Sequence, residues 1–139
     1  VEPLAHVLQR LGSRHVLVVH ARDGLDEISV GEPTDVAELK DGQVRRFSIR
    51  PEDFGLRRSD IEAIRVDSVK ASLAMILAVL EDHAGPARDI VVLNAGAAIY
   101  VAGLAGSLAE GVQRADSVIS AGGARKKLDQ LVVLTQSFD

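Results

Sequence analysis

The segment His15–Ser29 reads HVLVVHARDGLDEIS and carries the strongest signals for both fold and chemistry. Its apolar run, Val16–Val19, is typical of a strand that is covered on both faces of a parallel sheet. Gly24 then permits the backbone to turn. Asp26 and Glu27 follow as adjacent carboxylates. Ligands of open parallel sheets bind just beyond the carboxyl ends of the strands, so this pair is the candidate site.

Adjacent carboxylates suit a hard cation such as Mg²⁺. This ion takes one or two protein carboxylates and fills its other positions with water and phosphate oxygens. Neighbouring side chains of a regular strand point to opposite faces, so Asp26 and Glu27 can serve one site only if the backbone turns near Gly24. A solvated surface pair is the alternative, because most acidic residues are exposed.

Length and composition indicate at most one domain, with an aliphatic core, and the order of strand and helix patterns described below indicates an α/β fold. The 139 residues are 47% hydrophobic and only 3% aromatic. The absence of cysteine excludes a disulfide framework or a Cys-based zinc site in this sequence and fits a reducing compartment. The net charge of −4 argues against nucleic-acid binding. We expect no membrane span, because the most apolar run, Ile90–Ala102, is shorter than the ~20 residues required. Val1–Pro3 shows no signal-peptide pattern, and a start without Met fits an internal start.

Two further strand signals lie between the acidic pair and the second half. Ile28–Val30 predicts a second short strand. Val36–Leu39 and Val44–Ile49 flank Asp41–Gly42, which is a favourable two-residue hairpin turn. Within the second arm of this hairpin, Arg45–Arg46 predicts solvent-facing charges that protect an exposed strand from wrong pairing.

Helical patterns account for the remaining segments. The spacing of apolar residues predicts a first helix over Leu4–Leu11 that stops at Gly12, and most of the second half is helical. Arg88–Ala102 is apolar nearly all round, so we expect a helix buried on most sides. The predicted boundaries are a cap at Asp67 or Ser68, a break at Gly85–Pro86, a stop at Gly103, a capping box at Ser107–Glu110 and a break at Gly122–Gly123 before the last helix.

Few other residues offer chemistry. His20 stands near the acidic pair and could touch a ligand, but a partly buried histidine bonded to the backbone is favoured. Asn94 interrupts an apolar helix, and we interpret it as a buried amide satisfied by neighbouring backbone. Glu81–His83 and Arg125–Lys127 are interpreted as solvated helix ends. No nucleophile or His-Glu-x-x-His motif occurs, so any chemistry rests on the acidic pair.

The order and spacing of several short motifs resemble anthranilate phosphoribosyltransferase. The run Asp23–Ser29, DGLDEIS, is similar to the acidic metal motif of that family. The motifs that follow it in the same order are Pro33–Thr34, Ala37–Gly42, Pro51–Leu56, Arg88–Asp89, Val92–Ala98, Ser107–Gly111 and Lys127–Val132.

The resemblance implies a fold and a reaction. Residues 1–139 would form the carboxyl-terminal part of the large α/β domain of a phosphoribosyltransferase/nucleoside-phosphorylase-like fold, of the glycosyl transferase family 3 type, with no complete second domain. The enzyme would join anthranilate to the ribose of 5-phosphoribosyl 1-pyrophosphate in tryptophan biosynthesis. Asp26 and Glu27 match the family's magnesium-binding carboxylates, with Glu27 shared by two Mg²⁺ ions and Asp26 on one. No catalytic residue would lie on this chain.

The resemblance also implies what lies elsewhere. The glycine-rich phosphate loop, the anthranilate-binding residues and a helical dimerisation domain would precede Val1, in a cytoplasmic homodimer. This chain alone would then be inactive. Ile64–Ser72 lacks the Gly-Gly-Asp stretch of many members, so we expect no site residue there. A pyrimidine-nucleoside phosphorylase and a non-catalytic binding domain remain the alternatives.

Overall fold

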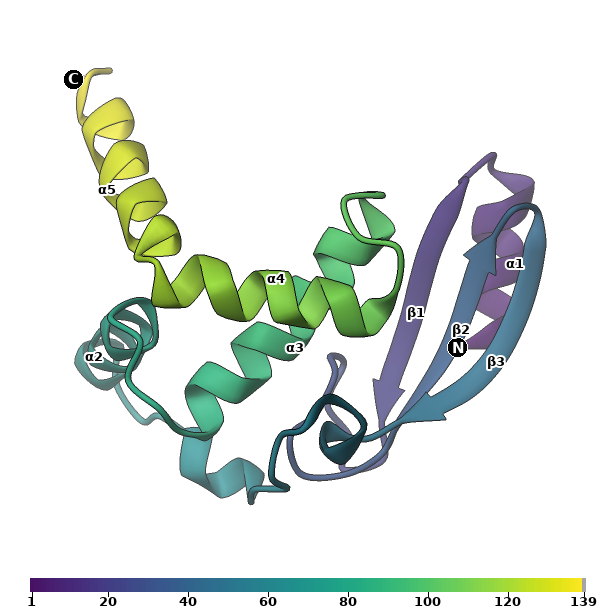
Figure 1. The fold of residues 1–139 in the computed structure, drawn as a ribbon, viewed down its shortest axis with the longest axis horizontal. Coiled ribbons are helices and arrows are strands. Elements are labelled where there is room, and N and C mark those ends of the chain that lie inside the picture. The colour runs from purple at the N-terminus through teal and green to yellow at the C-terminus, as the bar shows by residue number, and fades with distance from the viewer. Residues whose placement is uncertain (139) are drawn as a thin grey trace.

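A three-stranded sheet packs against helices in an α/β arrangement (Figure 1). The structure is a computed structural model that describes residues 1–138. Among these residues, no helix is both long enough and apolar enough to cross a membrane. The elements are α1 Glu2–Arg10, β1 His15–Ala21, β2 Thr34–Lys40, β3 Gln43–Ile49, the 3-10 turns η1 Pro51–Phe54 and η2 Ile61–Ile64, and the helices α2 Val69–Leu80, α3 Pro86–Val101, α4 Leu108–Ser120 and α5 Gly123–Gln136.

β1 is an edge strand of an antiparallel sheet within the described residues. The order is β1-β2-β3, with Val19 opposite Val36 and Val16 opposite Leu39. The side chains of Val16–Val19 are only half-buried. The expectation of a parallel sheet with this strand covered on both faces is therefore wrong here. An apolar run indicates a strand, but it does not specify which strand pairs with it.

Side-chain alternation along β2 gives the sheet two different faces. One face of the sheet carries Leu39, which is fully buried, and Ala37. Arg46 of β3 lies opposite Ala37 on this face and forms an ion pair with Glu2 of α1 at 3.1 Å, so this face is covered by α1. Glu38 and Lys40 point to the other face, towards α3. The sheet therefore lies between α1 and the α3–α4 pair (Figure 1).

The predicted hairpin is confirmed. Asp41 and Gly42 have φ angles of 51° and 73° and join β2 to β3 by a two-residue turn. Positive φ at both positions is the signature of the turn whose twist matches that of paired strands. Arg45 and Arg46 are exposed, as expected for an outer strand.

The helix boundaries follow the predicted caps closely. Ser68 and Ser107 cap α2 and α4 by accepting hydrogen bonds from backbone N–H groups three residues later. Gly103 has a φ angle of 74° and ends α3. The capping box at Ser107 forms only in part, because the Glu110 carboxylate accepts from the N–H of Gly106 at 2.7 Å instead of that of Ser107.

Helix α3 is the centre of the core and packs most closely on α4. Val92 and Leu93 are each only 1% exposed, and Val112 and Ala115 of α4 pack against the same cluster. At Gly96 a Cβ atom would lie 2.5 Å from the Cα of Val112. The glycine is therefore required for the close approach of the two helices.

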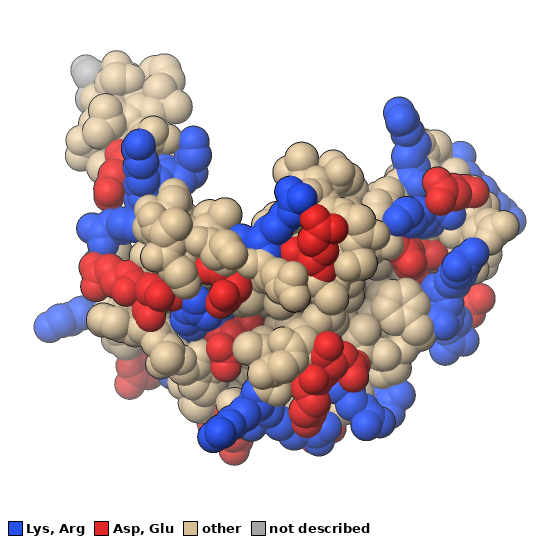
Figure 2. Space-filling view, in the orientation of Figure 1, with Lys and Arg blue, Asp and Glu red and all other residues tan. Residues whose placement is uncertain are grey.

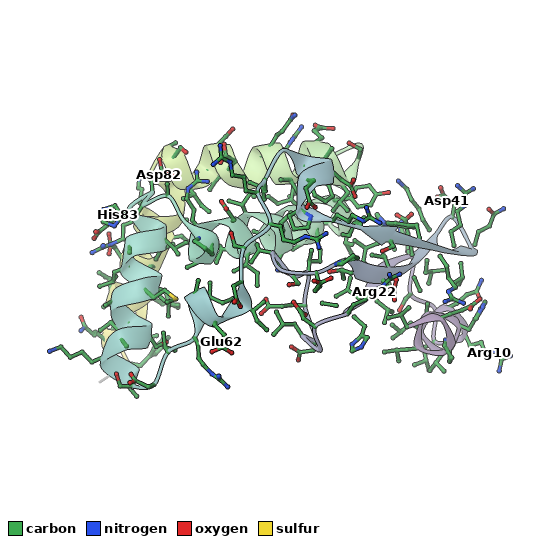
Figure 3. All side chains as sticks on the ribbon, turned by 90° about the horizontal axis from the view of Figure 1, so that it is seen from below. Arg10, Arg22, Asp41, Glu62, Asp82 and His83 are labelled. Atoms are coloured by element: carbon green, nitrogen blue, oxygen red, sulfur yellow. The ribbon has the colours of Figure 1, made fainter. Side chains whose placement is uncertain are left out.

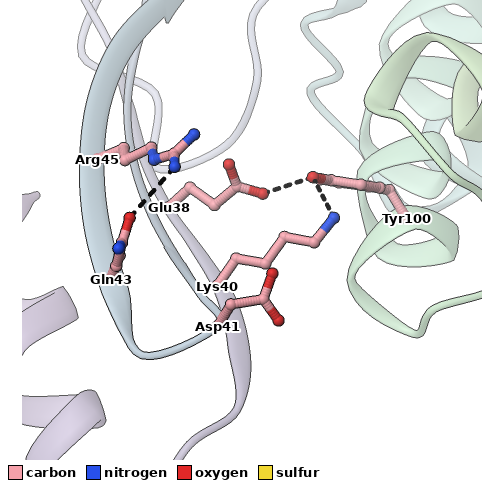
Figure 4. A pocket seen from close by; sticks show the side chains of 6 residues that line it. All are labelled: Glu38, Lys40, Asp41, Gln43, Arg45 and Tyr100. Carbon is pink, nitrogen blue, oxygen red and sulfur yellow. Dashed lines mark hydrogen bonds between the residues drawn. The ribbon is translucent and has the colours of Figure 1, made fainter.

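A polar network ties the end of α3 to the sheet (Figure 4). The Tyr100 hydroxyl donates to Glu38 at 2.6 Å, and the Lys40 ammonium donates to that hydroxyl at 3.1 Å. His15 meets the same carboxylate at 3.1 Å and the edge of the Tyr100 ring. Tyr100 is only 9% exposed and Glu38 is half-buried, so these hydrogen bonds are largely shielded from water and help to position α3 on the sheet.

Arg88 joins the start of α3 to its neighbours. Its side chain is 12% exposed and pairs with Asp82 at 2.7 Å and Asp116 at 2.8 Å. Arg125 of α5 likewise pairs with Glu81 at 2.8 Å. Asp82 and His83 both lie at the end of α2 (Figure 3). These helix ends are largely exposed to solvent, as expected, but folding also pairs Glu81, Asp82 and Arg125 with opposite charges from distant segments.

Replacing Arg88 by Met should remove a pH-dependent part of the stability. The hydrogen bond from Arg88 holds the pKa of Asp82 below its ordinary value, which is about 3.9 for an unfolded chain. This contribution is complete above that value and is lost as the pH falls through the lower folded pKa.

Urea unfolding of wild type and Arg88→Met between neutral and strongly acidic pH tests this expectation. The difference between their midpoints should shrink as the pH falls. A constant difference would show that Arg88 acts through packing alone.

Large apolar side chains remain exposed on α2 and α5. Val69 of α2 is 88% exposed, while Val133 and Phe138 in and beyond α5 are 69% and 79% exposed. Figure 2 shows basic and acidic residues interspersed over one face of the molecule, whereas the far end of α5 is uncharged. Contiguous exposed apolar patches mark interaction sites or surfaces that are prone to association.

The 139-residue chain by itself should therefore bind a dye specific for exposed apolar surface. Fluorescence titration with such a dye provides the measurement. A cooperatively melting monomer that binds no dye would contradict this expectation.

Candidate metal site

The acidic pair lies in the loop between β1 and β2, residues 22–33. Gly24 has a φ angle of 96°, and the N–H of Ala21 donates to the carbonyl oxygen of Leu25 at 3.0 Å. The chain thus turns sharply after β1, as the sequence predicted. Arg22, at the start of the loop, pairs with Asp35 of β2 at 3.0 Å and lies beside the sheet (Figure 3).

Asp26 and Glu27 are exposed and electrostatically coupled. Both residues are classed as exposed, in a bend with no regular secondary structure. Partial burial raises the pKa of Glu27, and the neighbouring charge of Asp26 raises it further. Like charges on adjacent residues repel each other, and a cation near both carboxylates would relieve that repulsion.

This arrangement fits a Mg²⁺ ion that is shared with a phosphate ligand. Within residues 1–138 no group of three or more His, Cys, Asp or Glu side chains is placed to hold a metal ion. A closed, all-protein site is thus not formed by the described residues. Mg²⁺ binds through one or two carboxylates and takes its remaining ligands from water and phosphate, which is what an exposed pair can provide.

A third acidic residue, Asp23, stabilises the loop by internal hydrogen bonds. One oxygen of its carboxylate accepts from the N–H of Leu25 at 3.3 Å, and the other accepts from the hydroxyl of the buried Ser29. Ser29 in turn accepts from the N–H of Gly31 at 2.8 Å. Asp23 is therefore committed to loop structure, which leaves Asp26 and Glu27 as the free carboxylates of this motif.

Ile28–Val30 does not form the predicted second strand. The N–H of Ser29 donates to the hydroxyl of Thr34, and the carbonyl of Val30 accepts from the N–H of Ser59 at 2.9 Å. These backbone groups are satisfied by a side chain and a loop rather than by a neighbouring strand. Ile28 and Val30 are part of the core. A short apolar run that is buried in a loop therefore has the same sequence pattern as a buried strand.

Asn94 connects the loop to α3. Its Oδ1 accepts from the N–H of Ile28, and its Nδ2 donates to the carbonyl oxygens of Ile28 and Ile90, all at 2.9 Å. The prediction of an amide satisfied by backbone groups is thus confirmed, although the side chain is half-buried rather than fully buried. The sequence could not identify its partner, because Ile28 lies 66 positions away and any residue has the backbone groups that Asn94 binds.

His20 is exposed and is not the backbone-bonded histidine that the sequence favoured. Its side chain makes no hydrogen bond to the residues that the structure describes. It stands at the end of β1 near the acidic loop, but the structure gives it no partner among residues 1–138. Sequence reasoning also missed Ser29 and Thr34, whose short side chains bond the loop internally.

The sequence matches a known family over most of its length. Residues 1–125 match the family described as the glycosyl transferase family, a/b domain. The chain belongs to this family. The family match confirms the α/β fold class and the resemblance that the ordered motifs indicated.

Curated relatives in this family share high identity with the chain. It is 62% identical over 137 residues to the anthranilate phosphoribosyltransferase of Thioalkalivibrio sulfidiphilus and 57% identical over 138 residues to that of Methylococcus capsulatus. Each alignment covers 99% of this chain but 40% of the relative. The chain thus spans about two fifths of the length of these relatives.

Solved structures show the same fold. Anthranilate phosphoribosyltransferase from Thermus thermophilus superimposes with a TM-score of 0.85 at 36% identity, covering 94% of this chain and 38% of that one. The Saccharomyces cerevisiae enzyme in complex with PRPP and Mg superimposes with a TM-score of 0.78 at 21% identity, covering 88% of this chain and 36% of that one. At that identity the second likeness concerns the fold alone.

Proposed function

We propose that this chain is the carboxyl-terminal part of an anthranilate phosphoribosyltransferase and supplies its magnesium-binding carboxylates. The observation that carries the proposal is the pair of exposed, mutually repelling acids, Asp26 and Glu27, on a braced loop. The substrate assignment is supported by relatives of that name, which align with nearly the whole chain.

The reaction explains why acids are needed on a chain without a nucleophile. Breaking the bond between the ribose and pyrophosphate leaves negative charge on the leaving group. A magnesium ion held at these carboxylates would stabilise that charge and help to orient the donor. Asp26 and Glu27 hold the metal from the protein side, and their exposure leaves the remaining coordination positions to phosphate and water.

Finer features belong to the same proposal. Glu27 would contribute to holding two magnesium ions and Asp26 to holding one. The full-length enzyme works in the cytoplasm as a homodimer and carries its donor-phosphate and anthranilate sites outside these 139 residues, which form no complete second domain. Neither a pyrimidine-nucleoside phosphorylase nor a non-catalytic domain is favoured, since the relatives compared above are anthranilate phosphoribosyltransferases.

Glu27→Gln should raise the Mg²⁺ requirement of the full-length enzyme more than any single surface change. The amide keeps the shape of the side chain and removes its charge, on which Mg²⁺ binding depends. We expect a loss of activity at limiting Mg²⁺ of about 10²-fold or more, which corresponds to ~3 kcal/mol.

Steady-state rates over a range of Mg²⁺ concentrations check this expectation. Glu81→Gln is the matched control, because Glu81 is also an exposed acid and its ion-pair partner in the described residues is Arg125 of α5. Wild-type rates for Glu27→Gln at limiting Mg²⁺ would refute the metal assignment.

The purified 139-residue chain should show no transferase activity. Catalysis needs both substrates held in line, and the proposed phosphate and anthranilate sites lie outside this chain. The decrease of anthranilate fluorescence in the presence of donor and Mg²⁺ measures turnover, with the full-length enzyme as the positive control. Robust turnover by the chain alone would show that it contains a complete site.

A further inference from the structure

We propose that Asn94 is a positioning residue, which acts through Ile28 to hold the magnesium-binding carboxylates in place. The inference rests on the proposed function, because it concerns the geometry of the Asp26–Glu27 pair. Asn94 lies on α3 and points its amide at the backbone of the loop. It touches neither of the two carboxylates in the structure and is not a catalytic residue.

Asn94 reaches the backbone next to Glu27 with both ends of its amide. Its oxygen accepts from the N–H of Ile28, while its nitrogen donates to the carbonyl of the same residue, each at 2.9 Å. The second amide hydrogen goes to the carbonyl of Ile90, also at 2.9 Å and one helical turn earlier. Both donors and the oxygen are therefore engaged, so the side chain has one preferred orientation.

These bonds act directly on Glu27 through the planarity of the peptide unit. The N–H of Ile28 lies in the same rigid plane as the carbonyl and Cα of Glu27. Fixing this N–H thus fixes the orientation from which the Glu27 side chain departs. Within residues 1–138, the backbone of Asp26–Ile28 has no other hydrogen bond. Asn94 is the one polar tether of that short stretch.

The hydrogen bonds of Asn94 join the exposed acidic pair to the buried core of the fold. Ile28 is 3% exposed, while Val92 and Leu93, close to Asn94 along α3, are each 1% exposed. Loss of Asn94 would leave two buried backbone groups unpaired, and those groups would gain hydrogen bonds only by moving towards water. Such a movement would carry Glu27 with it and displace its carboxylate from the metal.

A merely structural asparagine would have a different signature. If Asn94 serves stability alone, its loss lowers the melting temperature and the amount of active enzyme, but surviving molecules bind Mg²⁺ normally. If it positions the pair, its loss raises the Mg²⁺ concentration for half-maximal rate, and excess Mg²⁺ restores much of kcat. Loss of groups that orient metal ligands typically weakens metal affinity by about 10- to 100-fold.

The test compares four variants in the full-length enzyme. Asn94→Ala removes the three bonds and leaves a gap, whereas Asn94→Leu removes them while roughly keeping the volume. Ile119→Ala is the stability control, since it opens the same core from α4, where Ile119 is 4% exposed. Glu27→Gln reports whether the pair binds Mg²⁺ at all. For each, rates against Mg²⁺ and the melting temperature are measured.

Both Asn94 variants should raise the half-saturating Mg²⁺ concentration about tenfold, in the range expected for such groups, and excess Mg²⁺ should restore much of kcat. Ile119→Ala should melt earlier with no such shift. An unchanged Mg²⁺ requirement in Asn94→Leu overturns the inference, even if Asn94→Ala fails to fold. If Glu27→Gln shifts the requirement and Asn94→Leu does not, the inference alone fails. If Glu27→Gln shifts nothing, the proposed function fails and the inference with it.

Discussion

The hydrogen bonds between Asn94 and Ile28 resolve a conflict between burial and charge on which the site depends. Ile28 must enter the core with Val36 and Val92, whereas the residues before it must remain in solvent. A loop that dips into a core cannot leave its backbone polar groups unpaired. The Asn94 amide satisfies both groups of Ile28 from α3. One side chain thereby permits burial on one side of a peptide bond and exposed charge on the other.

Close helix packing makes this arrangement rigid. Gly96 lies two residues after Asn94 and allows α4 to approach the backbone of α3. At the end of α3, Tyr100 bonds Glu38 and Lys40 of the sheet. At its start, Arg88 bonds Asp82 and Asp116. Contacts at both ends thus fix the helix that carries Asn94. Through its hydrogen bonds to Ile28, Asn94 in turn positions the loop of residues 22–33.

Local signals in the sequence predicted most elements, because their causes are local. The Asp41–Gly42 turn needs only its own backbone conformation, and the caps at Ser68 and Ser107 need only the following turn. Strand pairing was mispredicted because the apolar run Val16–Val19 indicates burial but does not determine which strand pairs with it. Ile28–Val30 was mispredicted for a related reason, since its partners are the side chains of Asn94 and Thr34 and the backbone of Ser59.

The candidate site divides in the same way. Asp26 and Glu27 could be singled out from sequence because two adjacent acids after a turn are a local pattern, and the motif order gave them a role. Asp23 belongs to the same short run, yet only the structure shows that Ser29 and Leu25 occupy its carboxylate. The surroundings of each carboxylate therefore determine its role. An acid with two hydrogen-bond donors beside it braces the loop, whereas an acid with another acid beside it gains most from a cation.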